Sequence, residues 1–350
     1  METKLWKLNP SSFERDELKE AGAILKNGGL VAFPTETVYG LGGDAKNPNA
    51  SKAIYAAKGR PSDNPLIVHI AEFSQLEEIV KAVPDTAKKL ADAFWPGPMT
   101  LILEKNSVIP METTGGLNTV AVRLPSHPVA RELILESGCL IAAPSANTSG
   151  RPSPTKADHV WEDLSGKIDG IIDGGSVEIG LESTIIDLTE DIPVILRPGY
   201  ISLDDVIQVC GAAKMDPGIL SEDKKVRPKA PGMRYRHYAP KGNLVVVEGS
   251  KDVVVEKINS LSKDAVLSGK KVAVLASKET SASYSYGDVF TIGSFSDEEE
   301  IARNLYAVLR EFDHSEIEQI YSESFETPHM GQAIMNRLLK AAGHQIIEVL

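Results

Sequence analysis

The chain has 350 residues, of which 42% are hydrophobic and 25% are charged, values typical of a globular protein with two domains. Its 37 Lys and Arg residues against 49 Asp and Glu give a net charge of −12, which excludes a broadly basic surface for nucleic acid or anionic lipid. No apolar run approaches the roughly 18 residues of a membrane-spanning helix, and no apolar leader is visible, so we expect a cytoplasmic protein.

Residues 1–210 alternate helix-like and strand-like segments, which predicts an α/β domain with a large mixed sheet. Helices are expected over 16–29, 74–95 and 127–138, where the apolar residues recur at helical spacing. Short apolar strands, bounded by Gly, Pro or Asn, are expected over 29–35, 64–70, 99–105, 119–125, 140–146, 170–175, 183–188 and 193–199.

Residues 211–241 differ in composition and charge. They carry eight Lys or Arg against three Asp or Glu, a net charge of +5, whereas residues 1–210 and 242–350 carry −10 and −7. This segment is also rich in Pro and Gly, which predicts a basic linker between two domains.

Residues 242–350 resume the α/β pattern and predict a smaller Rossmann-like domain. Strands are expected over 243–249, 271–277, 288–294, 318–324 and 344–350, and helices over 297–314 and 330–343. No GxGxxG follows the first strand, so dinucleotide binding is not indicated.

The two cysteines, Cys139 and Cys210, lie in apolar stretches and have no CxxC spacing. Two thiols cannot complete a four-ligand zinc site, so we expect buried thiols in a reducing compartment. P-loop, HExxH and GxSxG motifs do not occur either, which leaves short polar stretches at strand ends as the candidate sites.

Two of these stretches come early in the chain. In "FPTETVYGLGG", residues 33–43, Thr35 and Thr37 supply hydroxyls, although a strand-to-helix turn with capping threonines would look the same. In "KGRPSDNPLIVHI", residues 58–70, Lys58 and Arg60 sit on a loop stiffened by prolines, which suits an oxyanion; a solvated basic turn is the alternative. His69 alone is compatible with an ordinary core histidine.

Three further stretches lie between residues 118 and 199. Arg123 ends a buried strand that starts near Thr119, and it needs an anionic partner, either a structural acid or a substrate carboxylate. The segment "IAAPSANTSGRPSPT", residues 141–155, offers hydroxyls, an amide and backbone N–H groups for an anion or a nucleotide, or forms a polar turn. Ser183 and Arg197 mark two strands that would also suit a plain hairpin.

In this order, "PTETVYGLG", "KGRPSDNPL", "APSANTSGRPSPT", "LESTIIDL" and "LRPG" resemble the threonylcarbamoyl-AMP synthase family. Residues 1–210 resemble its YrdC-like catalytic domain. The linker "PGMRYRHYAP" and residues 242–350 resemble the longer, two-domain form, so the likeness covers essentially the whole chain. It implies a nucleotidyltransferase that joins L-threonine, bicarbonate and ATP into threonylcarbamoyl-AMP and pyrophosphate, for a later transfer to tRNA by other proteins.

The resemblance also implies a role for each candidate residue. Lys58 and Arg60 would face the triphosphate and balance its charge during attack on the α-phosphate. The residues implied on the L-threonine side are Thr35, with Thr37 less certain, His69, Arg123 on the carboxylate, the backbone of Ala143, and Ser183. Those implied on the ATP side are Asn64, Thr119, Ser145, Asn147, Ser153 and Arg197. Mg²⁺ is expected with ATP; the sequence does not identify its ligands, and Glu182 is one candidate.

The basic linker gains a role from the same resemblance. Arg234, Tyr235, Arg236, His237 and Tyr238 would fold over the nucleotide as a lid, since cations suit a triphosphate and aromatic rings suit adenine. A solvated, flexible linker is the alternative.

Other classes of protein compete with this interpretation. Carbamoyl transferases of the hydrogenase-maturation type share the YrdC-like domain, but they are larger and carry zinc-finger cysteines, whereas this chain has two cysteines. A non-catalytic RNA-binding module fits poorly with a charge of −10 over residues 1–210. The C-terminal domain could also be a regulatory or docking module, and the sequence shows no convincing site in it.

Overall fold

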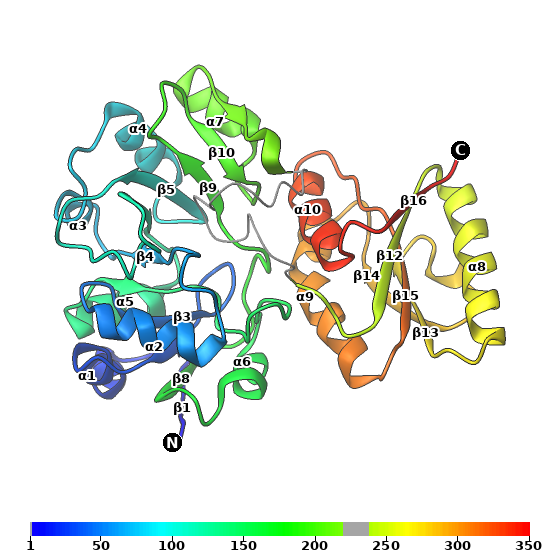
Figure 1. Cartoon of the computed structure of the whole chain (residues 1–350), viewed down its shortest axis with the longest axis horizontal. Helices are drawn as coiled ribbons and strands as arrows, with labels where there is room; N and C mark the ends of the chain where they lie inside the picture. Colours follow the sequence, from blue (N-terminus) through cyan, green and yellow to red (C-terminus); the bar gives the residue numbers. More distant parts are fainter. Residues whose placement is uncertain (1, 220–237) are drawn as a thin grey trace. The chain divides into compact units, whose positions relative to one another are not determined.

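The computed structural model describes residues 2–219 and 238–350 (Figure 1). It divides into two compact units, each described by itself below. Unit 1 comprises residues 1–149, 153–178 and 182–234, and unit 2 comprises 150–152, 179–181 and 235–350. The predicted domain boundaries stay predictions, because most of the predicted linker lies outside the described residues. No helix of the described part is long and apolar enough to cross a membrane.

Unit 1 is built on one 11-stranded mixed sheet. In spatial order its strands are β1 (Lys4–Lys7), β8 (Gly170–Asp173), β2 (Val31–Phe33), β3 (Gly40–Asp44), β7 (Ile141–Ala142), β4 (Ile67–His69), β6 (Thr119–Arg123), β5 (Met99–Glu104), β9 (Thr184–Asp187), β10 (Val194–Arg197) and β11 (Lys214–Met215). Its helical segments are η1 (Arg15–Leu18), α1 (Lys19–Lys26), α2 (Pro48–Lys58), α3 (Ser74–Glu77), α4 (Asp85–Phe94), α5 (Pro128–Ser137), α6 (Ala157–Leu164), α7 (Leu203–Cys210) and η2 (Pro217–Ile219).

The two faces of this sheet are covered differently. On one face a large apolar core joins the strands to residues of α2, α4, α6 and α7, such as Ile54, Leu90 and Val206. On the other face α1 and α5 pack against Phe33 and its neighbours at the β1–β8–β2 end. Further along that face a small apolar cluster consists of strand residues alone: Ile67, Ile102, Ala121, Ile185, Val194 and Leu196. The candidate site residues surround this cluster.

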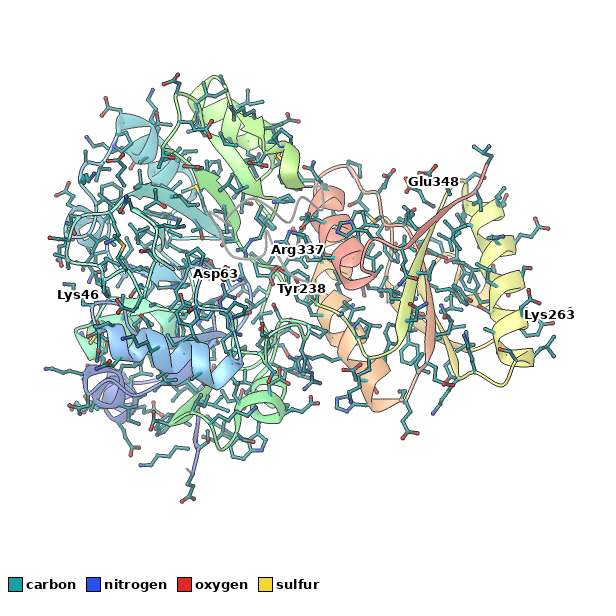
Figure 2. The ribbon with its side chains drawn as sticks, viewed as in Figure 1. Lys46, Asp63, Tyr238, Lys263, Arg337 and Glu348 are labelled. Carbon is teal, nitrogen blue, oxygen red and sulfur yellow. The ribbon has the colours of Figure 1, made fainter. Side chains whose placement is uncertain are left out.

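Unit 2 contains a five-stranded, fully parallel sheet. Its strands, in spatial order, are β14 (Asp288–Gly293), β13 (Val272–Ser277), β15 (Gln319–Glu323), β12 (Asn243–Glu248) and β16 (Ile346–Glu348). Helix α8 (Lys251–Leu267) covers one face, and α9 (Glu298–His314) and α10 (Gly331–Ala341) cover the other, with η3 (Ser281–Ser283) between β13 and β14 (Figure 1). Lys263 points outward from the solvent side of α8 (Figure 2).

The predicted α/β class is confirmed, as is the smaller Rossmann-like layer near the C-terminus. The predicted helix over 74–95 is wrong as a single helix, because the chain turns at 78–84 and Pro84 becomes the N-cap of α4. The two thiols are only partly buried, contrary to the prediction, and burial raises the pKa of each.

The stretch from 33 to 43 is not a strand-to-helix turn. The chain reverses after β2 and returns as β3, which pairs antiparallel with it from Val31–Gly42 to Phe33–Gly40. A Cβ on Gly42 would lie 2.8 Å from Ile141 Cγ2, so this strand needs glycine to approach its neighbour. Sequence propensity hid the strand because Gly is a poor strand former in isolation.

Candidate active site

Alternation along the central strands puts a set of polar residues on one sheet face. In β6, Val120 and Val122 point into the large core, so Thr119, Ala121 and Arg123 face the opposite side. The same alternation places His69 of β4 and Thr100 of β5 on this face; Ile67 and Ile102, two residues away on the same strands, belong to the small strand-only cluster. We call this surface the site face.

The strand register gathers several of these residues at one end of the site face. His69 and Thr100 are both direct neighbours of Arg123, on either side of it. Thr100 Oγ1 lies 2.7 Å from Ser183 Oγ, and Arg197 Nη2 donates to Ser183 Oγ at 3.2 Å. Arg197 also donates twice to the Ser183 carbonyl, at 2.9 and 3.1 Å. Four predicted site residues, separated by up to 128 positions in the sequence, therefore form one contiguous polar cluster.

Arg123 has a partner that the sequence did not identify. Its Nη2 lies 2.7 Å from Oε1 of Glu36, and the two side chains are only 5% and 3% exposed. The contact is ionic rather than a well-oriented hydrogen bond. Within the described part of the chain, both carboxylate oxygens of Glu36 lack a hydrogen-bond partner, and so do Nε and Nη2 of Arg123. Both groups therefore retain hydrogen-bonding capacity for a ligand that carries a carboxylate or an ammonium group.

Glu36 is the functional candidate that sequence reasoning missed. The two hydroxyls of "PTET" predict polar contacts, whereas the sequence predicts no role for the charged residue between them. An acid in an otherwise uncharged, Gly-rich stretch that follows a buried strand was the available signal. The burial of Glu36 beside Arg123 could be known only from the fold.

His69 is buried in the same cluster. Its Nδ1 lies 3.1 Å from the Ile67 carbonyl, and its ring meets Phe33 edge-on. Burial, together with the positive charge of Arg123, lowers the pKa of His69 to about 3. His69 is thus a neutral imidazole near pH 7, suited to donating or accepting one hydrogen bond rather than to holding an anion by charge.

This depressed pKa predicts a specific acid sensitivity. His69 is protonated in the unfolded chain below its ordinary pKa of 6.5 but stays neutral in the folded chain down to about 3, so folding becomes less favourable as pH falls below 6.5. Between pH 7 and pH 5 the contribution is about 2 kcal/mol. His69→Gln should reduce the loss of unfolding free energy over this interval by that amount, measured by urea titration at both pH values. The exposed His314→Gln is the control, and equal losses in wild type and His69→Gln would contradict the assignment.

Thr35 and Thr37 hold the loop between β2 and β3 together. Thr35 Oγ1 donates to the Val38 carbonyl at 2.6 Å and accepts from the amides of Thr37 and Val38. It also lies 2.9 Å from Thr37 Oγ1. Both hydroxyls have local structural partners, so the predicted contact of Thr35 with L-threonine stays a prediction.

Lys58 lies in a setting different from the predicted loop. It is the last residue of α2, whose helix ends where Gly59 adopts φ +61°. The side chain is 1% exposed, which rules out the solvated basic turn for this residue. Its Nζ donates to the Ser145 carbonyl at 2.5 Å and to the Asn147 carbonyl. Lys58 therefore anchors the loop that carries two predicted nucleotide-binding residues.

The loop after Lys58 is held by the guanidinium group of Arg60, which bonds to the backbone of the same loop. Arg60 donates to the carbonyls of Asn64 and Pro65, at 3.3 and 3.1 Å. Asn64 is 2% exposed, and its side-chain oxygen accepts no hydrogen bond from the described residues. A buried amide oxygen without a donor is costly, so it is a natural contact for a ligand.

The segment 143–147 connects the two groups of residues. The Ala143 amide donates to the Ile67 carbonyl at 2.8 Å, beside β4, and the chain then passes to Ser145, whose Oγ donates to Asn147 Oδ1 at 2.5 Å. Thr119 lies at the other end of β6 from Arg123, about 13 Å away at the usual rise per strand residue. The site face is therefore elongated, with Arg123 at one end and Thr119 at the other.

Ser153 and Glu182 form a separate buried pair in unit 1. Ser153 Oγ donates to Glu182 Oε1 at 2.6 Å, and the two residues are 1% and 7% exposed. Within residues 2–219 and 238–350, no group of three or more His, Cys, Asp or Glu side chains could hold a metal ion. The expected Mg²⁺ and the candidacy of Glu182 as its ligand stay predictions.

Most of the predicted lid lies outside the described residues: Arg234, Tyr235, Arg236 and His237. Tyr238 is described, and it belongs to unit 2, where its ring stacks on that of Tyr306 at 5.0 Å. Its predicted contact with the nucleotide stays a prediction.

Comparisons with known proteins cover the chain from residue 23 to residue 343. Residues 23–199 match the family described as "Telomere recombination" (Sua5, YciO, YrdC), and residues 201–343 match "Threonylcarbamoyl-AMP synthase, C-terminal domain". Threonylcarbamoyl-AMP synthase of Pyrococcus abyssi is 51% identical over 336 residues, which cover 96% of this chain and 97% of that protein. The Bacillus subtilis protein of the same name is 48% identical over 351 residues, covering 99% and 100%.

The fold is also shared with a solved structure. The crystal structure of Pyrococcus abyssi Sua5 complexed with L-threonine aligns with a TM-score of 0.93 and 48% identity, covering 100% of both chains.

Proposed function

Because the chain belongs to the threonylcarbamoyl-AMP synthase family, we propose that it is an L-threonylcarbamoyladenylate synthase, a nucleotidyltransferase that makes threonylcarbamoyl-AMP and pyrophosphate. Its substrates are L-threonine, bicarbonate and ATP. The product supplies the threonylcarbamoyl group that downstream transferases attach to an adenosine of tRNA. The observation that carries the proposal is the elongated site face, with the buried Arg123 at one end and Thr119 at the other.

The charged end of the site face suits a zwitterionic amino acid. Arg123 binds the carboxylate of L-threonine, because a guanidinium pairs with a carboxylate through two parallel hydrogen bonds. The Glu36 carboxylate, 2.7 Å from Arg123, is then placed to accept from the ammonium group. The neutral His69 and the Ser183 hydroxyl complete this end, and they bind polar substrate atoms without adding charge.

The reaction needs positioning and charge neutralisation more than a covalent nucleophile. The ammonium group of L-threonine first gives a proton to water, and the free amine then forms a C–N bond with bicarbonate, which loses one of its oxygens as water. With carbon dioxide the same bond forms, and a second proton passes from the nitrogen to water. The resulting N-carboxylate attacks the α-phosphate of ATP, and pyrophosphate leaves with the electrons of the broken P–O bond. Lys58, Arg60 and Arg197 face the triphosphate in this proposal and offset the charge that develops on it. Mg²⁺ bound to the phosphates supplies further neutralisation.

Neutral groups serve the adenosine half. Asn64 offers a buried amide oxygen, and Ser145, Asn147, Ser153 and Thr119 offer side-chain oxygens along the same face and its adjoining loop. Enclosure of the reacting groups matters because the N-carboxylate is labile in water. Tyr235 and His237 of the proposed lid would provide that enclosure.

The proposed reaction predicts a strict dependence on all three substrates. Pyrophosphate release by the purified full-length chain, with Mg²⁺ present, should fall to background when either L-threonine or bicarbonate is omitted. L-Serine should support release about 10- to 100-fold less efficiently in kcat/KM, because one methyl group contributes only ~1–3 kcal/mol. Release that is indifferent to L-threonine, or no release with every substrate present, would overturn the synthase proposal and favour a nucleotide- or RNA-binding module.

A further inference from the structure

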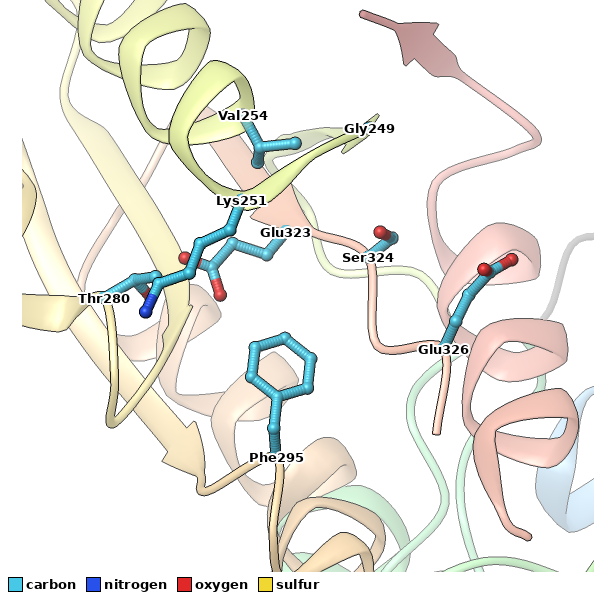
Figure 3. Close-up of a pocket in the computed structure, with 8 residues that line it drawn as sticks. All are labelled: Gly249, Lys251, Val254, Thr280, Phe295, Glu323, Ser324 and Glu326. Carbon is cyan, nitrogen blue, oxygen red and sulfur yellow. The ribbon is translucent and has the colours of Figure 1, made fainter. Parts of the chain in front are cut away.

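Unit 2 contains a pocket that the proposed reaction does not use. Its volume is about 200 Å³, and it opens at the carboxyl ends of the parallel strands (Figure 3). Lys251 follows β12, Thr280 follows β13, Phe295 follows β14, and Glu323 ends β15. Four strands thus contribute to one cavity, at the edge where open parallel sheets build their ligand sites.

Glu323 supplies a buried negative charge at the base of the pocket. It is 3% exposed and accepts hydrogen bonds from the Ser277 amide at 2.9 Å and the Tyr284 hydroxyl at 2.5 Å. Burial and the bond to Glu323 raise the pKa of Tyr284, so the phenol keeps its proton and remains the donor. A carboxylate has about four acceptor positions, so Glu323 can still accept from a ligand in the pocket.

Lys251 supplies the opposite charge across the cavity. It is the first residue of α8, and its ammonium group reaches toward Thr280 and Glu323 (Figure 3). No carboxylate of the described residues lies within ion-pair distance of it. The Ser250 side chain does not cap α8, so the first-turn amides beside Lys251 can also receive an anionic group.

Apart from Ser324, the remaining side chains of the lining are apolar or acidic. The rings of Phe295 and Phe325 meet at 5.8 Å, yet Phe295 remains 37% exposed and, with Val254, presents an apolar wall to the cavity. At the mouth, the pKa of Glu248 is raised, mainly by burial and also by the negative charge of the nearby Glu326. An ammonium group would relieve the repulsion between these carboxylates.

We propose that this pocket binds a free α-amino acid with an apolar side chain. The ammonium group lies between Glu323 and Glu326, the carboxylate lies on Lys251 and the first turn of α8, and the side chain packs on Phe295 and Val254. The cavity is smaller than the ~300–1,000 Å³ typical of drug-sized ligands, which fits a ligand of this size. None of the residues that line this pocket has a role in the proposed synthase reaction.

Isothermal titration calorimetry on the full-length chain tests this proposal. The probes are L-leucine, L-methionine, L-phenylalanine and L-isoleucine, with isoamylamine and 4-methylpentanoate as the one-charge analogues of leucine. At least one amino acid should bind with 1:1 stoichiometry, and each analogue should bind at least about tenfold more weakly, because it lacks one charge-assisted contact.

Three variants assign the binding to this pocket. Lys251→Met should weaken binding about 10- to 100-fold, whereas Lys263→Met, the same change on the solvent side of α8, should leave it unchanged. Glu323→Gln should weaken binding of the amino acid, because its ammonium group loses a charged partner. The melting temperature of this variant is recorded to confirm that it folds. Binding that survives Lys251→Met, isoamylamine that binds as well as leucine, or no heat with any of the four amino acids would each overturn the proposal. If Arg123→Met abolished the binding heat and the pocket variants did not, the amino acid would bind at the site face and not in this pocket.

Discussion

Arg123→Met is expected to lower L-threonine-dependent pyrophosphate release about 100-fold or more, through a large rise in the KM for L-threonine. Losing one partner of a buried, charge-assisted contact to a substrate carboxylate costs about 2–5 kcal/mol, and methionine keeps the bulk of the side chain without its charge. The same substitution should also destabilise the fold by about 3–5 kcal/mol, because Glu36 is left as an uncompensated buried charge.

A double variant separates these two effects. In Arg123→Met/Glu36→Gln neither buried charge remains, so most of the lost unfolding free energy should return, while the KM for L-threonine should stay high. Urea titration and pyrophosphate release on the four proteins of this cycle give both quantities. If the double variant regained both stability and activity, Arg123 would be a structural partner of Glu36 and the assignment to the substrate carboxylate would be wrong.

The Arg123–Glu36 pair also shows where sequence reasoning stops. The position of Arg123 at the end of an apolar strand was enough to predict that it needed an anionic partner. Which acid serves could not be predicted, because Glu36 lies 87 positions earlier in the chain and meets Arg123 only through the register of the sheet. Likewise, the hydroxyl of Thr100 joined the site through its pairing with Arg123, not through any motif.

Secondary structure was predictable where apolar runs were bounded by strong turn residues, as in β4, β6 and β10. It was missed where the apolar pattern was diluted or ambiguous. Helix α8 has three consecutive valines in its first turns, at 253–255, a strand-like run, yet its buried residues fall at helical spacing: Val254, Ile258, Ser262 and Ala265. Helix α2, "PNASKAIYAAK", has few large apolar residues and was recognisable mainly by its ends, Asn47 as N-cap and Gly59 as C-cap.

The end of α2 was consequential for the site, because it buries Lys58. A lysine followed closely by arginine and proline is typical of an exposed basic loop, and the family resemblance predicts that its charge faces the triphosphate. The structure adds a second role: Lys58 satisfies two carbonyls of the loop 145–149, and its own carbonyl accepts from the Ser149 amide at 2.9 Å. The Lys58 side chain thus has two roles: a proposed contact with ATP, and positioning of the loop 145–149.

Lys58→Met is therefore expected to affect both stability and nucleotide use. Each carbonyl left without its donor costs about 1–3 kcal/mol, so the free energy of unfolding should fall by at least about 2 kcal/mol. The KM for ATP should rise about tenfold or more, because Ser145 and Asn147 lose the contact that fixes their loop, while the KM for L-threonine should change less. Steady-state pyrophosphate release at varied ATP and varied L-threonine measures the two constants separately.

The matched control is Lys52→Met, the same change on the same helix at a side chain that is 61% exposed and pairs with Glu112. It should alter stability by less than about 1 kcal/mol and leave both KM values unchanged. Lys58→Arg distinguishes positioning from charge: it preserves the charge but places a larger, forked group in a fully enclosed space. If Lys58→Arg had the KM for ATP of the wild type, a positive charge at this position would be enough for ATP use. If its KM for ATP rose as much as in Lys58→Met, the geometry of the two carbonyl contacts would matter most.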